Sequence, residues 1–306
     1  MKIYRSILEI VGNTPIVSLN KVTNGCSADI YAKLEMFNPS GSAKARAALG
    51  MIEDAEQKGI IRPGETTIIE PTSGNQGIGL AMVGAVKGYR VIVVMPDTMS
   101  KERQDLVKAY GAEVVLSKGE EDIQGAVNLA NELLRQYANS WMPNQFGNPA
   151  NPDFHAQTTA QEILGQMDEV DAYIAGVGTG GTLTGVARVL KKKFPAIQVF
   201  AVEPKQSAVI SGNPPGSHRI QGIGDGFIPE NLDMSVVDGA LAVDENEAID
   251  MTRRLAMEEG ILAGISSGAA VVAAIKVGQI LGQGKKILTL LPDTGERYLS
   301  TRIFER

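Results

Sequence analysis

The stretch AYIAGVGTGGTLTGVARVLKK, residues 172–192, decides the fold class. It begins with a short apolar run typical of a buried β-strand, passes through a loop of glycine and threonine, and ends in a pattern typical of a helix. A strand that leads through a tight loop into a helix is the repeating unit of a parallel sheet covered by helices. The stretch therefore predicts an α/β protein.

Short apolar runs and helix-length segments alternate along nearly the whole chain. The predicted strands are residues 28–34, 66–69, 90–94, 113–116, 172–175, 198–202 and 286–291, and the predicted helices include residues 100–110, 122–137, 152–165 and 245–259. Several of the runs show no polar alternation, which indicates strands covered by helices on both faces. Turn-forming residues at 144–152 (NQFGNPANP) interrupt the alternation, so we expect a domain boundary there.

The composition limits the class of protein. The chain has 306 residues, of which 43% are hydrophobic and 21% charged, and its formal net charge is −6. An acidic chain is poorly suited to binding nucleic acid or an anionic membrane, and no apolar run approaches the roughly 18 residues of a membrane span. Because we also find no signal-peptide pattern, we expect a cytoplasmic protein.

Cysteine and histidine are too sparse to suggest a metal site. Cys26 is the single cysteine, and His155 and His218 are far apart in the sequence. No metal-binding spacing of these residues occurs, so we expect no protein-bound metal ion. The chemistry must then come from lysine, hydroxyl groups, backbone groups or a cofactor.

Lys44 is the first candidate for that chemistry. It lies in NPSGSAKARAA, residues 38–48, where Ser42 is a plausible N-cap and Lys44 falls in the first turn of the following helix. A cation is unfavourable at this end of a helix dipole, which suggests a role other than surface solvation. An ordinary exposed lysine is the alternative.

Two loops at predicted helix starts suit anionic groups. In EPTSGNQGIG, residues 70–79, the side chains of Thr72, Ser73 and Gln76 flank exposed backbone N–H groups and could receive a carboxylate. In GVGTGGT, residues 176–182, glycine and threonine form a backbone cup for a phosphate. A dinucleotide-binding loop is the alternative for the second, because it fits GxGxxG in form. Its position in the middle of the chain argues against that interpretation.

The segment GISSGAA, residues 264–270, opens another predicted helix. Paired serines at a helix start are most often caps, but one of them could also hydrogen-bond a heteroaromatic nitrogen. Thr294, in LPDTGERYLS at the end of the last predicted strand, is a second candidate for that role.

Taken together, these segments resemble the cysteine synthase (O-acetylserine sulfhydrylase) and cystathionine β-synthase family of fold type II, or tryptophan-synthase-β type, pyridoxal-phosphate enzymes. The motifs NPSGSxK, PTSGNxGIGLA, QFxNPANP, GVGTGGTLTG, IQGIGxGFIP and GISSGAA occur in family order. The resemblance implies an α/β fold with two open, twisted, mostly parallel sheets flanked by helices. It also implies a smaller, mobile substrate-carboxylate domain of residues 1–11 and 36–147, and a larger domain of residues 12–35 and 148–306 that binds the cofactor phosphate.

The resemblance also implies roles for individual residues. Lys44 would be the catalytic Schiff-base lysine, Asn75 would contact the ring hydroxyl of the cofactor, and Ser266 would face its pyridine nitrogen, with Thr294 as the alternative. The residues expected at the phosphate are Gly176, Gly178, Thr179, Gly180, Gly181 and Thr182. The residues expected at the substrate are Thr72, Ser73, Gln76, Gln145, Gly222 and Asp225.

The implied reaction is β-replacement on O-acetyl-L-serine with sulfide, giving L-cysteine and acetate. Three positions depart from the family pattern: Ala45 stands where aspartate often follows the lysine, Gln76 where threonine is usual, and Asp225 where sulfide-using members often have a small residue. Because a carboxylate at the mouth of the site would attract an ammonium group, the alternative is a cystathionine β-synthase that uses homocysteine with O-acetylserine or serine. The resemblance further suggests a homodimer, with a serine acetyltransferase as a candidate partner. From another class, a nicotinamide-dependent oxidoreductase would use the glycine loop for a pyrophosphate.

Overall fold

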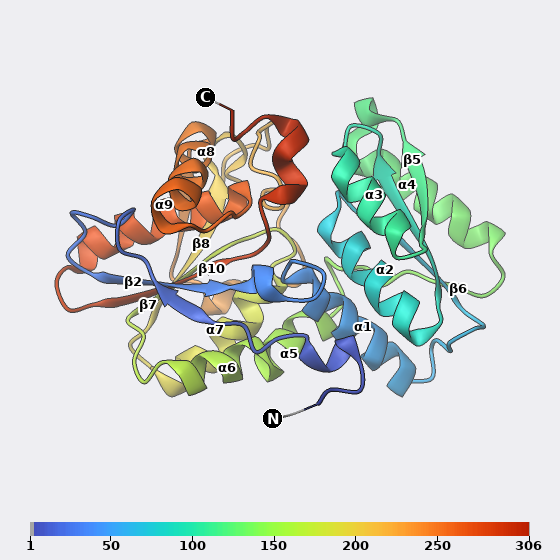
Figure 1. Cartoon of the computed structure of the whole chain (residues 1–306), viewed down its shortest axis with the longest axis horizontal. Helices are drawn as coiled ribbons and strands as arrows, with labels where there is room; N and C mark the ends of the chain where they lie inside the picture. Colours follow the sequence, from blue (N-terminus) through green and yellow to red (C-terminus); the bar gives the residue numbers. More distant parts are fainter. Residues whose placement is uncertain (1–2, 306) are drawn as a thin grey trace.

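The chain folds around two β-sheets that lie side by side in this computed structural model, which describes residues 3–305 (Figure 1). The larger sheet has six strands in the order β1 (Ile16–Ser18), β2 (Asp29–Leu34), β10 (Lys286–Leu291), β7 (Ala172–Gly176), β8 (Gln198–Pro204) and β9 (Gly239–Val243). The smaller has four, in the order β5 (Glu113–Ser117), β4 (Arg90–Pro96), β3 (Thr67–Pro71) and β6 (Ser140–Trp141). Only β1 pairs antiparallel, so the predicted α/β fold with two mostly parallel sheets is confirmed.

Helices cover both faces of each sheet. In the six-stranded region, α8 (Glu245–Arg254) and α9 (Ile265–Leu281) lie on one face, and α5 (Ala150–Gln157), α6 (Thr159–Gln166) and α7 (Gly181–Lys193) lie on the other (Figure 1). In the four-stranded region, α4 (Asp122–Gln136) packs against β3 and β4, while α2 (Asn75–Lys87) and α3 (Lys101–Ala109) pack together. Helix α1 (Lys44–Gln57) packs against both α2 and α5, and it therefore joins the two regions.

Burial explains why the interior strands were recognisable in the sequence. All five residues of β3 are buried, as are the last six residues of β4. A strand covered on both faces needs no polar alternation, which matches the continuous apolar runs. The three strands that the sequence did not predict, β1, β6 and β9, are edge strands of two to five residues with mostly half-buried side chains. Short, partly exposed edges carry little hydrophobic signal.

Two predicted helices were wrong in their extent. Residues 152–165 form two helices, α5 and α6, because the backbone breaks at Thr158 (φ −119°, ψ −73°), whose hydroxyl donates to the carbonyl of Phe154 at 2.6 Å. Residues 245–259 form α8 followed by a π-helical turn, Leu255–Glu259, which ends at Gly260 (φ +70°). Within residues 3–305, no helix combines the length and the apolar character needed to cross a bilayer.

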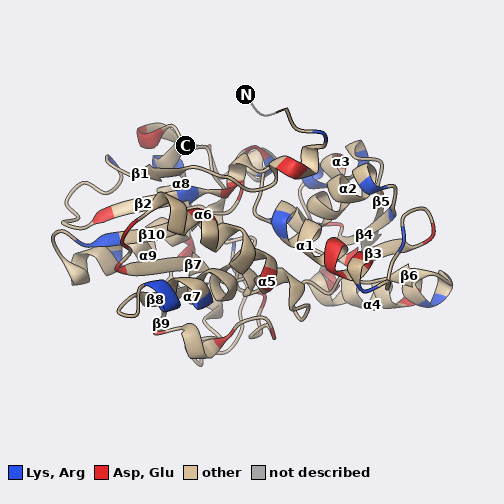
Figure 2. Ribbon diagram, turned by 90° about the horizontal axis from the view of Figure 1, so that it is seen from below, with Lys and Arg blue, Asp and Glu red and all other residues tan. Residues whose placement is uncertain are grey.

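Charged side chains are distributed over both regions. Figure 2 shows acidic and basic residues interspersed along the chain in this view, with no single basic face. This distribution agrees with the net charge of −6.

Candidate active site

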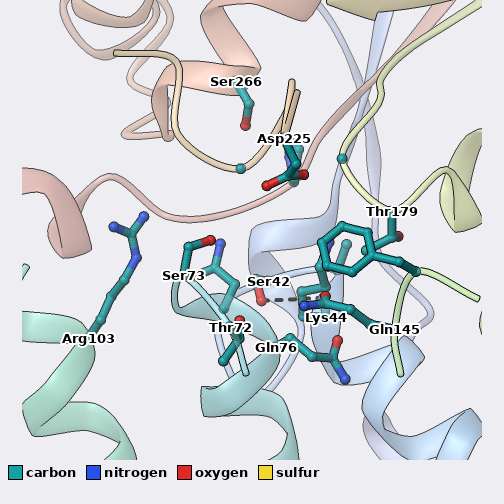
Figure 3. A pocket seen from close by; sticks show the side chains of 16 residues that line it. Ser42, Lys44, Thr72, Ser73, Gln76, Arg103, Gln145, Thr179, Asp225 and Ser266 are labelled. Carbon is teal, nitrogen blue, oxygen red and sulfur yellow. Dashed lines mark hydrogen bonds between the residues drawn. The ribbon is translucent and has the colours of Figure 1, made fainter. Parts of the chain in front are cut away.

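A pocket between the two sheet regions brings together segments that are far apart in the sequence. Helix α2 starts just after β3, α7 starts just after β7, and both loops point toward the start of α1. The carboxyl ends of parallel strands are the usual place for a ligand in such folds. Figure 3 shows the side chains that line this pocket.

Lys44 is the first residue of α1, and its side chain lies in the pocket. The residues before it pair with the end of β10: the N–H of Ala43 donates to the carbonyl of Pro292 at 2.8 Å. Burial lowers the pKa of the Lys44 ammonium below its ordinary value, and the charges of Asp225 and Asp293 partly offset this effect. A lysine with a lowered pKa offers a neutral amine, which can act as a nucleophile or a base.

The predicted N-cap of α1 was wrong. Ala43 occupies the N-cap position, and no side chain caps the helix there. Ser42 lies one residue earlier, and its hydroxyl accepts from the N–H of Lys44 at 3.3 Å. Ser42 thus fixes the backbone of Lys44 without being the formal cap.

Asn75 opens α2 with its side-chain amide held on both sides. Its Nδ2 donates to Oδ2 of Asp293 at 2.6 Å, and its Oδ1 accepts from Nη1 of Arg297 at 2.6 Å. Both partners come from the end of the six-stranded region, so this bond pair ties α2 to the far side of the pocket. The two contacts fix which way the amide faces, and therefore where its second N–H points.

The loop before α2 presents polar side chains to the pocket. Thr72 is buried and its hydroxyl accepts from the N–H of Gly74 at 3.1 Å, while Ser73 is partly exposed. Gln76 is only 1% exposed, and neither Nε2 nor Oε1 has a hydrogen-bond partner in the described part of the chain. A buried amide without partners is costly, which indicates a place for a polar ligand.

Gln145 lines the pocket, and three hydrogen bonds hold its backbone in place. Its N–H donates to Oε1 of Glu70 at 3.1 Å, and its carbonyl accepts from Asn151 and Asn231, each at 2.9 Å. Burial raises the pKa of the Glu70 carboxyl to about 8, although the N–H groups of Gln145 and Asn144 oppose this shift. The loop that carries Gln145 is thus clamped between the two sheet regions.

The glycine loop before α7 is tightly packed against its neighbours. A side chain at Gly178 would place Cβ 2.5 Å from the carbonyl oxygen of Gly222, and one at Gly181 would collide with Asn151. Gly180 is the N-cap of α7 with φ +78°, and no side chain caps the helix. An uncapped helix start of this kind leaves N–H groups for an anion and fits a phosphate.

The threonines of this loop are held from the protein side. Oγ1 of Thr179 accepts from Nδ2 of Asn151 at 3.1 Å, and Oγ1 of Thr182 lies 3.1 Å from Nε2 of His155. Burial, together with the nearby Arg46 charge, lowers the pKa of His155 to about 3. His155 is therefore neutral at physiological pH, and the loop carries no titrating group there.

The structure brings most of the sequence-predicted residues into one pocket. Those that line it are Lys44, Thr72, Ser73, Asn75, Gln76, Gln145, Gly178, Thr179, Gly222, Asp225 and Ser266. Those that do not are Gly176, Gly180, Gly181, Thr182 and Thr294. Of the two hydroxyls considered for the pyridine nitrogen, only Ser266 lines the pocket, whereas Thr294 lines a neighbouring groove and accepts from Nε of Arg297 at 3.1 Å.

The sequence did not predict two residues that belong to this site. Asp293, which holds Asn75, directly precedes Thr294 at the end of β10, so an acid at a strand end was an available signal. Arg103, which also lines the pocket, lies inside α3 within an ordinary charged pattern, and the sequence gives no signal for it.

Comparisons with known proteins agree with this geometry. A family model described as "Pyridoxal-phosphate dependent enzyme" matches residues 7–293. The chain is 53% identical over 301 residues to the cysteine synthase of Staphylococcus aureus (strain Mu50 / ATCC 700699), covering 98% of this chain and 96% of that one. Among solved structures, an O-ureido-L-serine synthase superposes with a TM-score of 0.95 at 46% identity, covering 99% of this chain and 96% of that chain. The O-acetylserine-dependent cystathionine β-synthase from Helicobacter pylori superposes with a TM-score of 0.92 at 41% identity, covering 98% of each chain.

Proposed function

The chain belongs to the family of pyridoxal-phosphate-dependent enzymes, and from this premise we propose how its residues share the work of a cysteine synthase. Its cofactor is pyridoxal phosphate, and its reaction replaces the acetate group of O-acetyl-L-serine by sulfide to give L-cysteine. The observation that supports this assignment of roles is the environment of Lys44. It is the one lysine among the described residues that line the pocket, and burial lowers its pKa.

The pocket offers groups that suit each part of the cofactor. Lys44 would hold it covalently, the amide of Asn75 would meet the ring hydroxyl, and the hydroxyl of Ser266 would meet the ring nitrogen. The uncapped start of α7, with its preceding glycines, fits a phosphate dianion. When bound, pyridoxal phosphate supplies an electron sink for the bonds broken at Cα and Cβ of the substrate.

Lys44 would then move the proton. With the substrate bound, the free Nζ of Lys44 would remove the proton from the substrate Cα as a general base. The lowered pKa of Lys44 favours the neutral amine that this step needs. The neutral hydroxyl of Ser266 would not stabilise a positive charge on the ring nitrogen, so loss of the Cα proton would accompany departure of acetate from Cβ.

The substrate carboxylate would bind at the start of α2. Thr72, Ser73, Gln76 and Gln145 are the proposed contacts. The buried, unpartnered amide of Gln76 supports this assignment, because a carboxylate oxygen would give its Nε2 the partner that it lacks. We also propose that residues 1–11 and 36–147 form a smaller domain that closes on the substrate and excludes water.

A second acceptor is the alternative function. Asp225 lines the pocket, and a carboxylate there would attract the ammonium group of homocysteine and repel hydrosulfide. The similarity to a cystathionine β-synthase supports this alternative. The product would then be cystathionine.

The assembly and location are further proposals. Large apolar side chains are exposed in the N-terminal part of the chain, at Ile3, Ile7 and Phe37, and they support a homodimer. Light scattering of the purified protein tests this. A serine acetyltransferase partner and a cytoplasmic location rest on the family resemblance alone.

The test of function is a rate comparison. Purified protein loaded with pyridoxal phosphate should form cysteine from O-acetylserine and sulfide, and the same assay with homocysteine measures the alternative acceptor. Absence of cysteine formation under these conditions would contradict the proposed function. Cystathionine formed at a much higher kcat/KM than cysteine would make homocysteine the principal acceptor.

A further inference from the structure

Arg103 is a buried cation beside the pocket that forms no salt bridge with an acidic side chain of residues 3–305. It lies in α3 and is 3% exposed, and none of the ion pairs found within residues 3–305 includes it. Its Nη1 donates to Oε1 of Gln221, and its Nε is buried without a partner. Arginine is almost never fully buried unless it is paired, so this guanidinium indicates a binding site for an anion.

The side chain of Arg103 is held in place before any ligand arrives. Its guanidinium carbon lies 4.7 Å from the ring centroid of Tyr298. The stem of Arg103 packs against Gly74, where φ is +148° and any Cβ would collide with Cδ and Nε of Arg103. An arginine fixed by an aromatic ring and a glycine loses little conformational entropy when it binds a planar anion.

Arg103 stands at the junction of two cavities. It lines the pocket that contains Lys44, whereas Gln221 lines an adjoining cavity of about 520 Å³. Ser73, Gly222 and Asp225 line both, so the contact between Arg103 and Gln221 lies where the two spaces meet. In Figure 3, Ser73 lies between Arg103 and Lys44, and Asp225 lies across from them. A second substrate that enters through the outer cavity would pass these residues.

The chemistry of these groups matches an amino acid. A guanidinium binds a carboxylate through two charge-assisted hydrogen bonds, which are stronger than a bond to the neutral amide oxygen of Gln221. Asp225, which lines the same pocket, carries the charge that an ammonium group requires. Hydrosulfide has neither a carboxylate nor an ammonium group. The carboxylate of O-acetylserine is already provided for at the start of α2.

We propose that Arg103 is a specificity-determining residue that binds the α-carboxylate of an amino-acid thiol acceptor, displacing the side chain of Gln221. This inference rests on the proposed function, since it names the class of nucleophile that the same site accepts. It extends the homocysteine alternative by a residue that fixes the acceptor through its carboxylate.

The experiment compares three acceptors at saturating O-acetylserine: homocysteine, 3-mercaptopropylamine and sulfide. The second is homocysteine without its carboxylate. The protein should prefer homocysteine to 3-mercaptopropylamine by about tenfold or more in kcat/KM, as expected for one charge-assisted contact. Arg103→Met should remove most of this preference and leave the ratio of 3-mercaptopropylamine to sulfide unchanged. Arg103→Lys, which keeps the charge and loses the planar fork, should fall between the two.

A matched variant separates recognition from a purely structural contact. Gln221→Met removes the competing acceptor for Arg103, so it should raise kcat/KM for homocysteine about two- to fivefold relative to sulfide. If the contact between Arg103 and Gln221 only holds α3 in place, Arg103→Met and Gln221→Met should instead lower the rates with all three acceptors by similar factors. That result would overturn the proposal.

Two other outcomes also overturn it. A rise in KM for O-acetylserine in Arg103→Met, with no change in acceptor preference, would assign Arg103 to the first substrate. A protein that makes cysteine from sulfide but does not use homocysteine would refute this inference alone. A protein that makes no cysteine at all would refute the proposed function and, with it, this inference.

Discussion

The loops that precede α7 and α2 occupy equivalent positions in the fold but present different chemical groups to the pocket. Each follows a parallel strand and leads into a helix without a side-chain cap. At α7, close packing dictates the glycines, and the threonines already have protein partners, so the backbone N–H groups are what the loop offers to a ligand. At α2, the loop presents side chains to a ligand. The amide of Gln76 is buried without hydrogen-bond partners among the described residues, and contacts across the pocket fix the orientation of the Asn75 amide.

The two sides also differ in their response to pH. His155, behind the glycine loop, has its pKa lowered to about 3, so it stays neutral. Glu70, behind the substrate loop, has its pKa raised to about 8, within the range in which enzymes are assayed. In the proposed function, the loop before α7 is the cradle of the cofactor phosphate, and the loop before α2 is the receptor of the substrate carboxylate. Substitutions should therefore affect cofactor retention on one side and substrate use on the other.

The largest expected effect lies between the two loops, at Lys44. Lys44→Ala should lower kcat about 10²- to 10⁴-fold, because the proposed covalent anchor and general base are both lost. The fold should be unaffected, as judged by circular dichroism and the melting temperature, because burial already disfavours the Lys44 ammonium in the folded protein. A variant that retained more than about a hundredth of the activity would remove Lys44 from its role.

The glycine loop before α7, the proposed cradle of the cofactor phosphate, is tested at Gly180. Gly180→Leu forces a side chain onto a residue with φ +78° whose Cβ would lie 2.8 Å from the backbone nitrogen of Leu232. The loop must then shift, and we expect the protein to be purified without bound pyridoxal phosphate, measured by its visible absorbance and by titration with the cofactor. Gly165→Ala in α6 is the control, since a Cβ there meets nothing within 4 Å. Unchanged cofactor affinity in Gly180→Leu would mean that the phosphate binds elsewhere.

The proposed carboxylate-binding loop at the start of α2 is tested at Gln76. Gln76→Leu keeps the volume roughly constant and removes the unpartnered amide. We expect KM for O-acetylserine to rise about tenfold, the value of one hydrogen bond to a charged group, while the cofactor content stays the same. If the amide is only a poorly satisfied part of the core, leucine should instead stabilise the protein and leave KM unchanged. Loss of cofactor in this variant would erase the proposed division between the two loops.

The acceptor side is tested at Asp225, where the expected effect is smaller. A favourable contact with an ammonium group in a partly exposed site is worth about 1 kcal/mol after desolvation, or roughly fivefold in rate. Asp225→Ala should therefore lower kcat/KM for homocysteine more than for sulfide, by about that factor. Equal changes for both acceptors would reduce Asp225 to a surface charge of the loop.

The sequence predicted the interior of this protein better than its edges and its long-range contacts. Strands such as β4 were recognisable because both faces are buried, whereas β6 has two half-buried residues and gives almost no signal. The same holds for the site. Motifs beside helix starts pointed to Lys44 and Gln76, since each stands at the start of a helix directly after a turn-forming loop. Arg103 depends on Gln221, 118 positions away, and no local pattern records such a contact.

The smallest expected effect concerns stability and Glu70. Because its pKa is raised in the folded protein, the folded state keeps a proton that the unfolded chain releases above its ordinary value of 4.5. The folded state therefore binds more protons between pH 4.5 and about 8, and the contribution of Glu70 to stability falls as pH rises through this window.

The Glu70→Gln variant lacks this titrating proton. At pH 5 we expect it to be less stable by about 1 kcal/mol, because the amide can accept from only one of the N–H groups of Asn144 and Gln145. At pH 9 the difference in melting temperature should shrink or reverse, since the parent then buries a charge. Thermal melts of both proteins at the two pH values measure this, with Glu132→Gln on the exposed face of α4 as the control. A constant difference between parent and variant would show that Glu70 does not titrate in this range, and the substrate loop would then be as insensitive to pH as the cradle.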